Sequence, residues 1–137
     1  MITKHSLDPQ DAITMAKLRP MLASTKGSVT GPSARAPFDE LMEQTPPADG
    51  VTYEKTEVGG VPGWRCRPNS APADAAILYF HGGAYVVGSA RAYQHFVGQV
   101  AARARVSAFV PEYGLAPEYP FPAAVDDAHA SFGGLSE

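Results

Sequence analysis

The most informative part of the sequence is the stretch Tyr79-Phe80-His81-Gly82-Gly83-Ala84-Tyr85-Val86-Val87-Gly88-Ser89. It begins at the end of an apolar run, residues 75–80, whose lack of alternation predicts a strand buried on both faces. A helical pattern starts near Ser89, so the stretch connects a strand to a helix. Two adjacent glycines in such a connection let the backbone turn sharply and approach a ligand with no side chain in between. We therefore interpret this stretch as a candidate binding loop.

The peptide N–H groups of the loop are its candidate chemical groups. Amides that point into an empty space can stabilise a developing negative oxygen, and one such donor contributes about 2.7–4 kcal/mol in acyl-transfer sites. Gly82, Gly83 and Ala84 would supply these amides, and we expect the ring of His81 to support the loop through hydrogen bonds. A histidine, two glycines and a small residue after an apolar strand match the oxyanion-hole motif of lipases and esterases.

Gly82-Gly83 taken alone has simpler interpretations. Two adjacent glycines most often form only a tight turn between a strand and a helix. A dinucleotide- or phosphate-binding loop is less favoured, because Ala84 interrupts the Gly-x-Gly-x-x-Gly spacing and no Gly-Lys-Ser/Thr follows.

A second stretch favours the catalytic interpretation: Pro111-Glu112-Tyr113-Gly114-Leu115-Ala116-Pro117-Glu118-Tyr119-Pro120-Phe121-Pro122-Ala123-Ala124. It resembles a signature of the hormone-sensitive-lipase family of α/β-hydrolase esterases, in which Tyr-Arg-Leu-Ala-Pro-Glu leads into Phe-Pro-Ala and a helix with paired acidic residues. Asp126-Asp127 matches that acidic pair, and the His-Gly-Gly stretch lies about thirty residues upstream, as in the family. Two residues depart from the family pattern. Ala84 replaces a third glycine but keeps its N–H, and Gly114 replaces an arginine, which removes any ion pair of that side chain.

The resemblance implies an α/β fold, namely the amino-terminal half of an α/β-hydrolase sheet with amino-terminal cap helices. Residues 1–48 would then be cap helices and linker, and residues 49–137 the first, incomplete part of the hydrolase core. The implied activity is hydrolysis of short acyl esters by a Ser-Asp/Glu-His triad, with the three amides named above as the oxyanion hole and His81 holding the loop. No metal or organic cofactor is implied. Candidates for acyl-pocket or lid contacts are Tyr85 and the helices near residues 15–22 and 38–42.

No serine of this chain fits the nucleophile position. The nucleophile of these enzymes lies in Gly-x-Ser-x-Gly, at a sharp turn after a strand. Ser33 and Ser131 each lack one of the two flanking glycines, Ser89 has a glycine directly before it rather than two residues away, and Ser136 belongs to a helical pattern. The nucleophile is therefore expected outside this chain, together with the acid and the histidine that follow it in the hydrolase order.

The remaining candidate residues have structural interpretations. Asp126 and Asp127 suit the first turn of the last helix, where carboxylates favour the positive end of the helix dipole. We interpret His95 and His129 as ordinary helix residues, His5 as a residue near a terminus, and Cys66 as a packing residue.

Local patterns predict the other elements. Asp8 and Pro9 should begin a first helix that Pro20 kinks or ends, with a loop over residues 27–37. A short helix that contains Phe38 should end before Pro46. A hairpin of residues 51–58 and 61–67, a helix capped by Ser89 and a strand at residues 106–110 follow, and alternating strands and helices favour a parallel sheet. In the capped helix, the residues that should face inward are Tyr93, Phe96, Val97, Val100 and Ala101. In a last helix, the residues that should share one face are Val125, Ala128, Phe132 and Leu135.

Composition excludes several classes of protein. The 137 residues suit a single domain, and 45% hydrophobic residues provide material for a core. Eleven basic and fourteen acidic residues give a net charge of −3 with no basic run, which argues against binding to nucleic acid. The single cysteine excludes an internal disulfide. Without a secretory signal or an apolar stretch long enough to span a bilayer, we expect a cytoplasmic protein.

The first parallel strand should lie at an open edge of the sheet in this chain alone, and such edges promote aggregation. We therefore expect two partners, a small-molecule ester substrate and the remainder of the hydrolase fold, from the same protein or from another chain. Three alternatives stay open: a non-catalytic ligand-binding protein on the same scaffold, an interaction protein that oligomerises through the open edge, and a peptidase.

Overall fold

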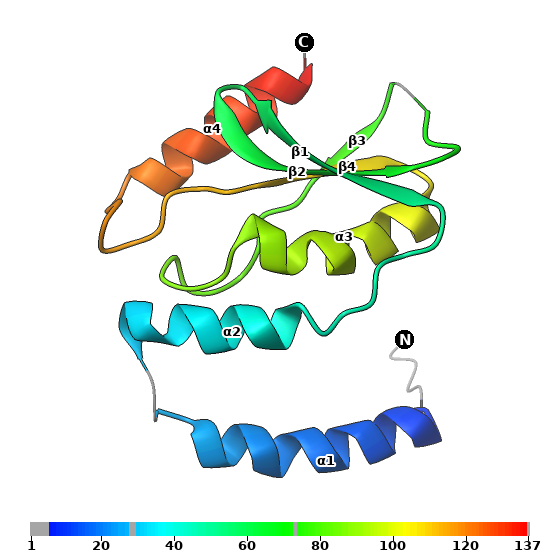
Figure 1. Cartoon of the computed structure of the whole chain (residues 1–137), viewed down its shortest axis with the longest axis vertical. Helices are drawn as coiled ribbons and strands as arrows, with labels where there is room; N and C mark the ends of the chain where they lie inside the picture. The colour runs from blue at the N-terminus through cyan, green and yellow to red at the C-terminus, as the bar shows by residue number, and fades with distance from the viewer. Residues whose placement is uncertain (1–5, 28–29, 73, 137) are drawn as a thin grey trace, which may run out of the picture. The chain divides into compact units, whose positions relative to one another are not determined.

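The computed structural model describes residues 6–27, 30–72 and 74–136, so His5 lies outside the described residues. The chain divides into two units, Met1–Thr30 and Gly31–Glu137. The first unit contains helix α1 (Pro9–Thr25). The second contains the other elements in Figure 1, including every strand.

Helix α1 begins as the sequence predicts but does not end at its proline. The Asp8 carboxylate accepts a hydrogen bond from the N–H of Gln10 at 2.8 Å, and Pro9 occupies the first helical position. Pro20 was expected to kink or end the helix, yet the helix continues to Thr25. A proline removes only its own N–H from the helical ladder, so the turns on both sides can keep their hydrogen bonds.

The sheet has four strands in the order β1-β2-β4-β3. The predicted hairpin is confirmed: β1 (Val51–Val58) and β2 (Val61–Pro68) pair antiparallel across Gly59-Gly60. Strand β4 (Ser107–Pro111) pairs antiparallel with β2 and parallel with β3 (Ala76–Leu78). The expected parallel pair is therefore present, and β3 lies at an edge of the sheet.

Strand β3 is shorter and more exposed than the sequence predicted. Its side chains are exposed at Ala76 and half-buried at Ile77 and Leu78, and Phe80 beyond it is 42% exposed. The prediction of a strand buried on both faces is wrong for the described residues, because β3 is an edge strand and the helix that follows it packs mainly on β2 and β4.

Helix α3 (Ala90–Ala104) connects β3 to β4 and packs on one face of the sheet, with α4 (Ala123–Ser136) on the other (Figure 1). Ser89 caps α3 as predicted, accepting from the N–H of Ala92 at 3.1 Å. The core between α3 and the sheet includes Cys66, Val97, Ala101, Ala108 and Val110. Burial raises the pKa of the Cys66 thiol to about 12, as expected for a packing residue.

The structure leaves part of each predicted apolar helix face exposed. Phe96 of α3 is 38% exposed and lies beside the ring of Tyr79, at the margin of the core. In α4, Val125 and Phe132 are exposed, and the residue that is fully buried is Ser131. Small residues form the buried side of α4 because the helix approaches the β1–β2 turn too closely for larger ones.

The prediction of a loop over residues 27–37 is also partly wrong. A 3₁₀ turn, η1 (Gly31–Ala34), leads into helix α2 (Arg35–Met42), which ends before Pro46 as predicted. Pro37 lies in the first turn of α2, where its missing N–H has no helical partner to lose. Helix α2 packs against α3, with the rings of Phe38 and Tyr93 6.4 Å apart.

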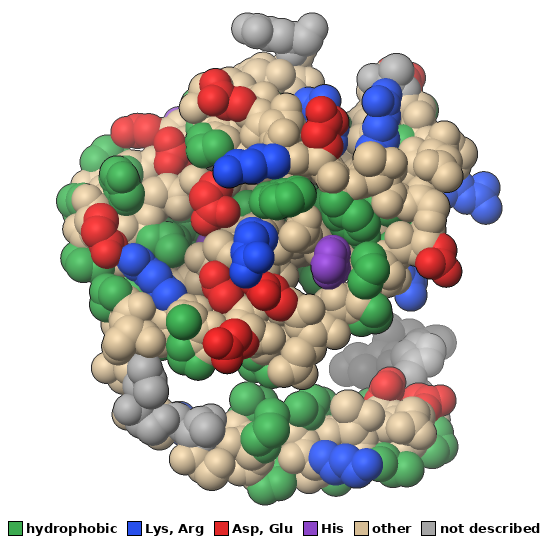
Figure 2. Space-filling view, in the orientation of Figure 1, with side chains coloured by type: hydrophobic (Ala, Val, Ile, Leu, Met, Phe, Trp, Pro, Cys, Tyr) green, Lys and Arg blue, Asp and Glu red, His purple; other side chains and the backbone are tan. Residues whose placement is uncertain are grey.

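None of the described helices is long and apolar enough to cross a bilayer. On the face drawn in Figure 2, acidic and basic side chains are mixed, and the described residues form no large basic patch there.

Candidate functional site

The loop between β3 and α3 has an unusual backbone. Gly83 has a φ angle of 135°, and the next two residues, Ala84 and Tyr85, have φ angles of 53° and 61°. Non-glycine residues rarely adopt this left-handed region, and their presence next to each other indicates a backbone held by its surroundings. The N–H groups of Val86 and Val87 both donate to the carbonyl oxygen of Gly83 at 3.0 Å, which closes the loop into a tight turn.

Three consecutive amides of the loop have no acceptor among the described residues. They are the N–H groups of Gly82, Gly83 and Ala84. The same three residues line a cavity of about 470 Å³. Its remaining lining residues are Phe80, His81, Tyr85, Tyr113, Ala124, Val125 and Ala128. Unused amides beside a cavity can bind an oxygen atom that bears negative charge.

Gly83 has no space for a side chain. A methyl group built there would collide with the carbonyl group of Val87, whereas one at Gly82 would meet only the Tyr93 hydroxyl, 3.7 Å away. At Gly88 a methyl group would lie 2.7 Å from Nδ1 of His81. Gly83 and Gly88 are therefore required by the packing of the loop.

His81 is 3% exposed and lies between two tyrosine rings. Its ring stacks on Tyr113 at a centroid distance of 4.4 Å and on Tyr93 at 5.4 Å. Nδ1 lies 2.9 Å from the carbonyl oxygen of Gly82 and 3.2 Å from the Tyr113 hydroxyl. Because a carbonyl oxygen can only accept, Nδ1 is the protonated nitrogen, and the buried Nε2 has no partner among the described residues.

Tyr113 is hydrogen-bonded to the backbone of His81 as well as stacked on its ring. Its hydroxyl donates to the carbonyl oxygen of His81 at 2.5 Å. Burial, and to a smaller extent the neighbouring Tyr85, raises the pKa of the phenol to about 12, so Tyr113 stays a neutral donor near neutral pH.

The stretch after β4 is held by carboxylates whose roles the sequence did not reveal. Glu112 accepts from the N–H of Ala90, at the start of α3, at 2.8 Å. Asp127 accepts from the N–H of Gly114 at 2.8 Å. Asp126 lies in the first turn of α4 as predicted, but Asp127 lies beyond it and holds the preceding segment instead. Both contacts join residues that are adjacent only in the folded chain.

The structure brings four of the predicted site residues, His81 to Ala84, to one cavity together with Tyr85. Residues 38–42 do not line it, and Phe38 and Met42 pack against the core instead. His95 binds the carbonyl oxygen of Thr45, and His129 is exposed on α4. No serine lines the cavity, and the described residues contain no group of three side chains suited to a metal ion.

Comparisons with known proteins relate this chain to α/β hydrolases. Residues 77–137 match a family described as having the alpha/beta hydrolase fold. An acetyl-hydrolase of Streptomyces hygroscopicus is 36% identical over 108 residues, which cover 75% of this chain and 34% of that protein. A crystal structure of a hormone-sensitive lipase from a metagenome library is 37% identical, with a TM-score of 0.77 over 96% of this chain and 43% of its own. A second crystal structure, of an esterase from the bacterial hormone-sensitive lipase family, is 29% identical, with a TM-score of 0.80 over 96% of this chain and 44% of its own. The chain thus spans less than half the length of these relatives.

Proposed function

Because this chain belongs to the α/β-hydrolase fold family, with esterases of the hormone-sensitive-lipase group as its structural neighbours, we propose that it supplies the oxyanion hole of a carboxylic ester hydrolase. The substrates are short acyl esters. The reaction uses a serine nucleophile which, with its acid and histidine partners, lies outside this chain.

The chemistry assigned to this chain is electrostatic. When a serine oxygen attacks the ester carbonyl, the carbonyl π electrons move to its oxygen, which becomes negatively charged. The N–H groups of Gly82, Gly83 and Ala84 donate to that oxygen and stabilise the tetrahedral intermediate. When the intermediate collapses, the carbonyl re-forms and the alcohol leaves with the proton that the serine gave to the histidine outside this chain. Water then attacks the acyl group left on the serine, the same amides stabilise the second tetrahedral intermediate, and its collapse frees the serine and the carboxylic acid.

The observation that supports this proposal most directly is the set of three consecutive unpaired amides beside the cavity. Amides bonded inside a simple tight turn would leave no donors for a ligand. His81 stabilises the backbone that carries these amides, because its Nδ1–H donates to the carbonyl oxygen of Gly82.

The test is hydrolysis of p-nitrophenyl acetate and butyrate by the complete protein and by its Gly83→Val variant. The side chain of valine would collide with the carbonyl of Val87 and displace the amides, so we expect kcat to fall about 100-fold or more. Gly133→Ala is the matched control, because a methyl group there meets nothing within 4 Å.

Wild-type activity in a folded Gly83→Val protein would refute the role of the loop. A complete protein that hydrolyses no ester but binds a small ligand would favour a non-catalytic binding protein on this scaffold. Faster cleavage of peptide substrates than of ester substrates would indicate a peptidase.

A further inference from the structure

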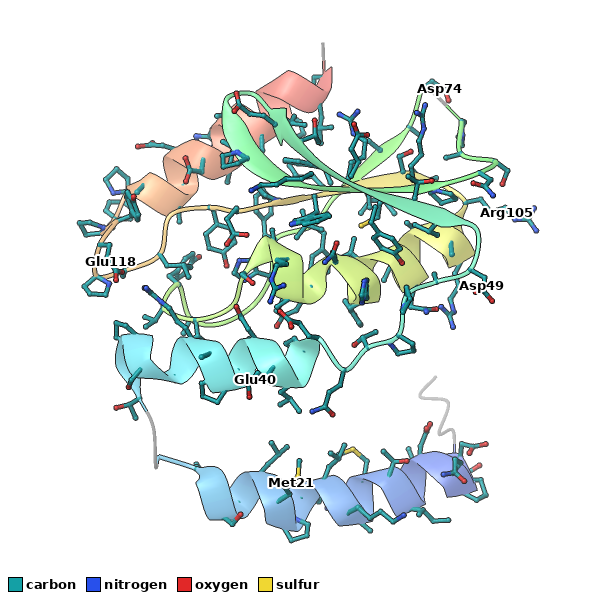
Figure 3. The ribbon with its side chains drawn as sticks, viewed as in Figure 1. Met21, Glu40, Asp49, Asp74, Arg105 and Glu118 are labelled. Atoms are coloured by element: carbon teal, nitrogen blue, oxygen red, sulfur yellow. The ribbon has the colours of Figure 1, made fainter. Side chains whose placement is uncertain are left out.

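Arg35 connects three segments of the second unit that are far apart in the sequence. From the first turn of α2, its Nε donates to the carbonyl oxygen of Val86 at 2.8 Å. Its Nη2 donates to the carbonyl oxygen of Ala116 at 2.9 Å. Its Nη1 and Nη2 also bind the two carboxylate oxygens of Glu118 at 2.9 and 2.7 Å. Glu118, labelled in Figure 3, lies on the bend between β4 and α4.

These contacts reach the loop between β3 and α3, residues 79–89, which we call the glycine loop. They lie at the part of this loop with the least favourable backbone conformation. Val86 directly follows Ala84 and Tyr85, the two residues in the left-handed region. Such conformations persist only where the surroundings hold them. The carbonyl oxygen of Tyr85 accepts from the N–H of Ala116 at 2.8 Å, so Ala116 is bonded both to the loop and to Arg35.

An ordinary surface ion pair would not explain this arrangement. The Arg91–Glu43 pair, in the same unit, is also 2.7 Å long, but it joins only two side chains. Arg35 in addition binds two backbone carbonyls, and its planar fork of donors fits all of these acceptors at once. Lysine has a single ammonium group and cannot reproduce that geometry.

We infer that Arg35 is a positioning residue, which holds the glycine loop so that the amides of residues 82–84 stay in place beside the cavity. Arg35 does not itself line that cavity. Its effect on catalysis rests on the proposed function, whereas its effect on the loop backbone does not.

The experiment compares Arg35→Met, Arg35→Lys and the control Arg91→Met in the complete protein. We expect Arg35→Met to lower kcat about 10- to 100-fold with little change in KM, because displaced amides weaken binding of the transition state more than binding of the substrate. Arg35→Lys should recover part of the loss, because it keeps the ion pair with Glu118. Arg91→Met should stay within about twofold of the wild-type kcat.

Amide hydrogen exchange provides a readout that needs no activity. The N–H groups of Val86, Val87 and Ala116 are hydrogen-bonded within and next to the loop, so they should exchange faster in Arg35→Met than in Arg91→Met. If the wild-type protein hydrolyses no ester, the proposed function fails, while the exchange rates still test the positioning role.

Two results would overturn the inference. One is a folded Arg35→Met protein with wild-type kcat and wild-type exchange in the loop. The other is a loss of kcat without faster exchange at these three amides. If Arg35→Met does not fold, Arg35→Lys is decisive, because wild-type kcat and exchange in that variant would show that the two carbonyl contacts are dispensable.

Discussion

At the scale of single residues, the candidate site depends on how His81 is packed. Its ring has neutral tyrosines on both faces, and its protonated nitrogen binds the backbone of the next residue. These contacts are what the proposed role of the histidine as a support for the loop requires. The buried carbonyl oxygen of His81 is in turn satisfied by Tyr113, so the support is a chain of contacts from Tyr113 through His81 to Gly82.

Tyr113→Phe tests that chain of contacts. The substitution keeps the stacked ring but removes the donor to the carbonyl oxygen of His81, and an unsatisfied buried carbonyl typically costs about 1–3 kcal/mol. We expect a lower free energy of unfolding in urea and a lower kcat. Tyr119→Phe is the control, because that side chain is 62% exposed. Equal stability of the two variants would contradict the role of the Tyr113 hydroxyl.

At the scale of secondary-structure elements, the contact between α4 and the β1–β2 turn depends on glycine. A methyl group at Gly134 would collide with the backbone of Gly59, and one at Gly59 would collide with the carbonyl of Ala130. This close approach explains why α4 buries its small residues and leaves Phe132 exposed.

Two adjacent glycines of α4 should respond to alanine in opposite directions. Gly134→Ala should destabilise the fold by about 1–3 kcal/mol, because the backbone of the hairpin must move. Gly133→Ala should be neutral or stabilise by up to about 1 kcal/mol, because alanine favours the helix and the site is open. Thermal or urea unfolding of both variants measures the difference. Equal stability of the two variants would show that α4 does not approach the turn this closely.

Local sequence signals predicted the elements that local chemistry determines. The caps at Asp8 and Ser89 and the hairpin at Gly59-Gly60 need only neighbouring residues to form. The glycine loop was likewise located from its residues and its place after a strand. Its role as an oxyanion hole stays a prediction.

Other features depend on contacts between distant residues, which the sequence pattern does not encode. Arg35 lies in a stretch predicted to be a loop, and its acceptors are more than fifty residues away. The bond from Gly114 to Asp127 and the small-residue face of α4 likewise appear only once the chain is folded. A hydrophobic periodicity cannot show which apolar face of a helix meets the sheet and which is left uncovered.

At the scale of the whole molecule, the two edges of the sheet differ in chemistry. Strand β1 presents charged residues, including Glu54, Lys55 and Glu57, whereas β3 consists of Ala76, Ile77 and Leu78. Charges on an edge strand discourage pairing with other chains, and their absence favours it. The β3 edge is therefore the surface to which we expect the remainder of the fold to add.

Residues 1–137 expressed alone should consequently associate through β3. We expect light scattering after size-exclusion chromatography to show dimers or larger species. Ala76→Lys should reduce this association, because residue 76 is exposed on that edge. Thr52→Lys adds the same charge to the β1 edge and should have little effect. A monodisperse, cooperatively unfolding monomer of the unmodified chain would contradict this expectation.

The left-handed backbone at Ala84 and Tyr85 also has a consequence for engineering this loop. Asparagine or glycine at these two positions would relieve an unfavourable conformation, so a selection for heat resistance should enrich them. Glycine, unlike asparagine, would also let the loop sample more conformations, so in the glycine variants turnover should fall as thermal tolerance rises. Variants with glycine at residue 84 or 85 would then be more resistant to heat but have a lower kcat.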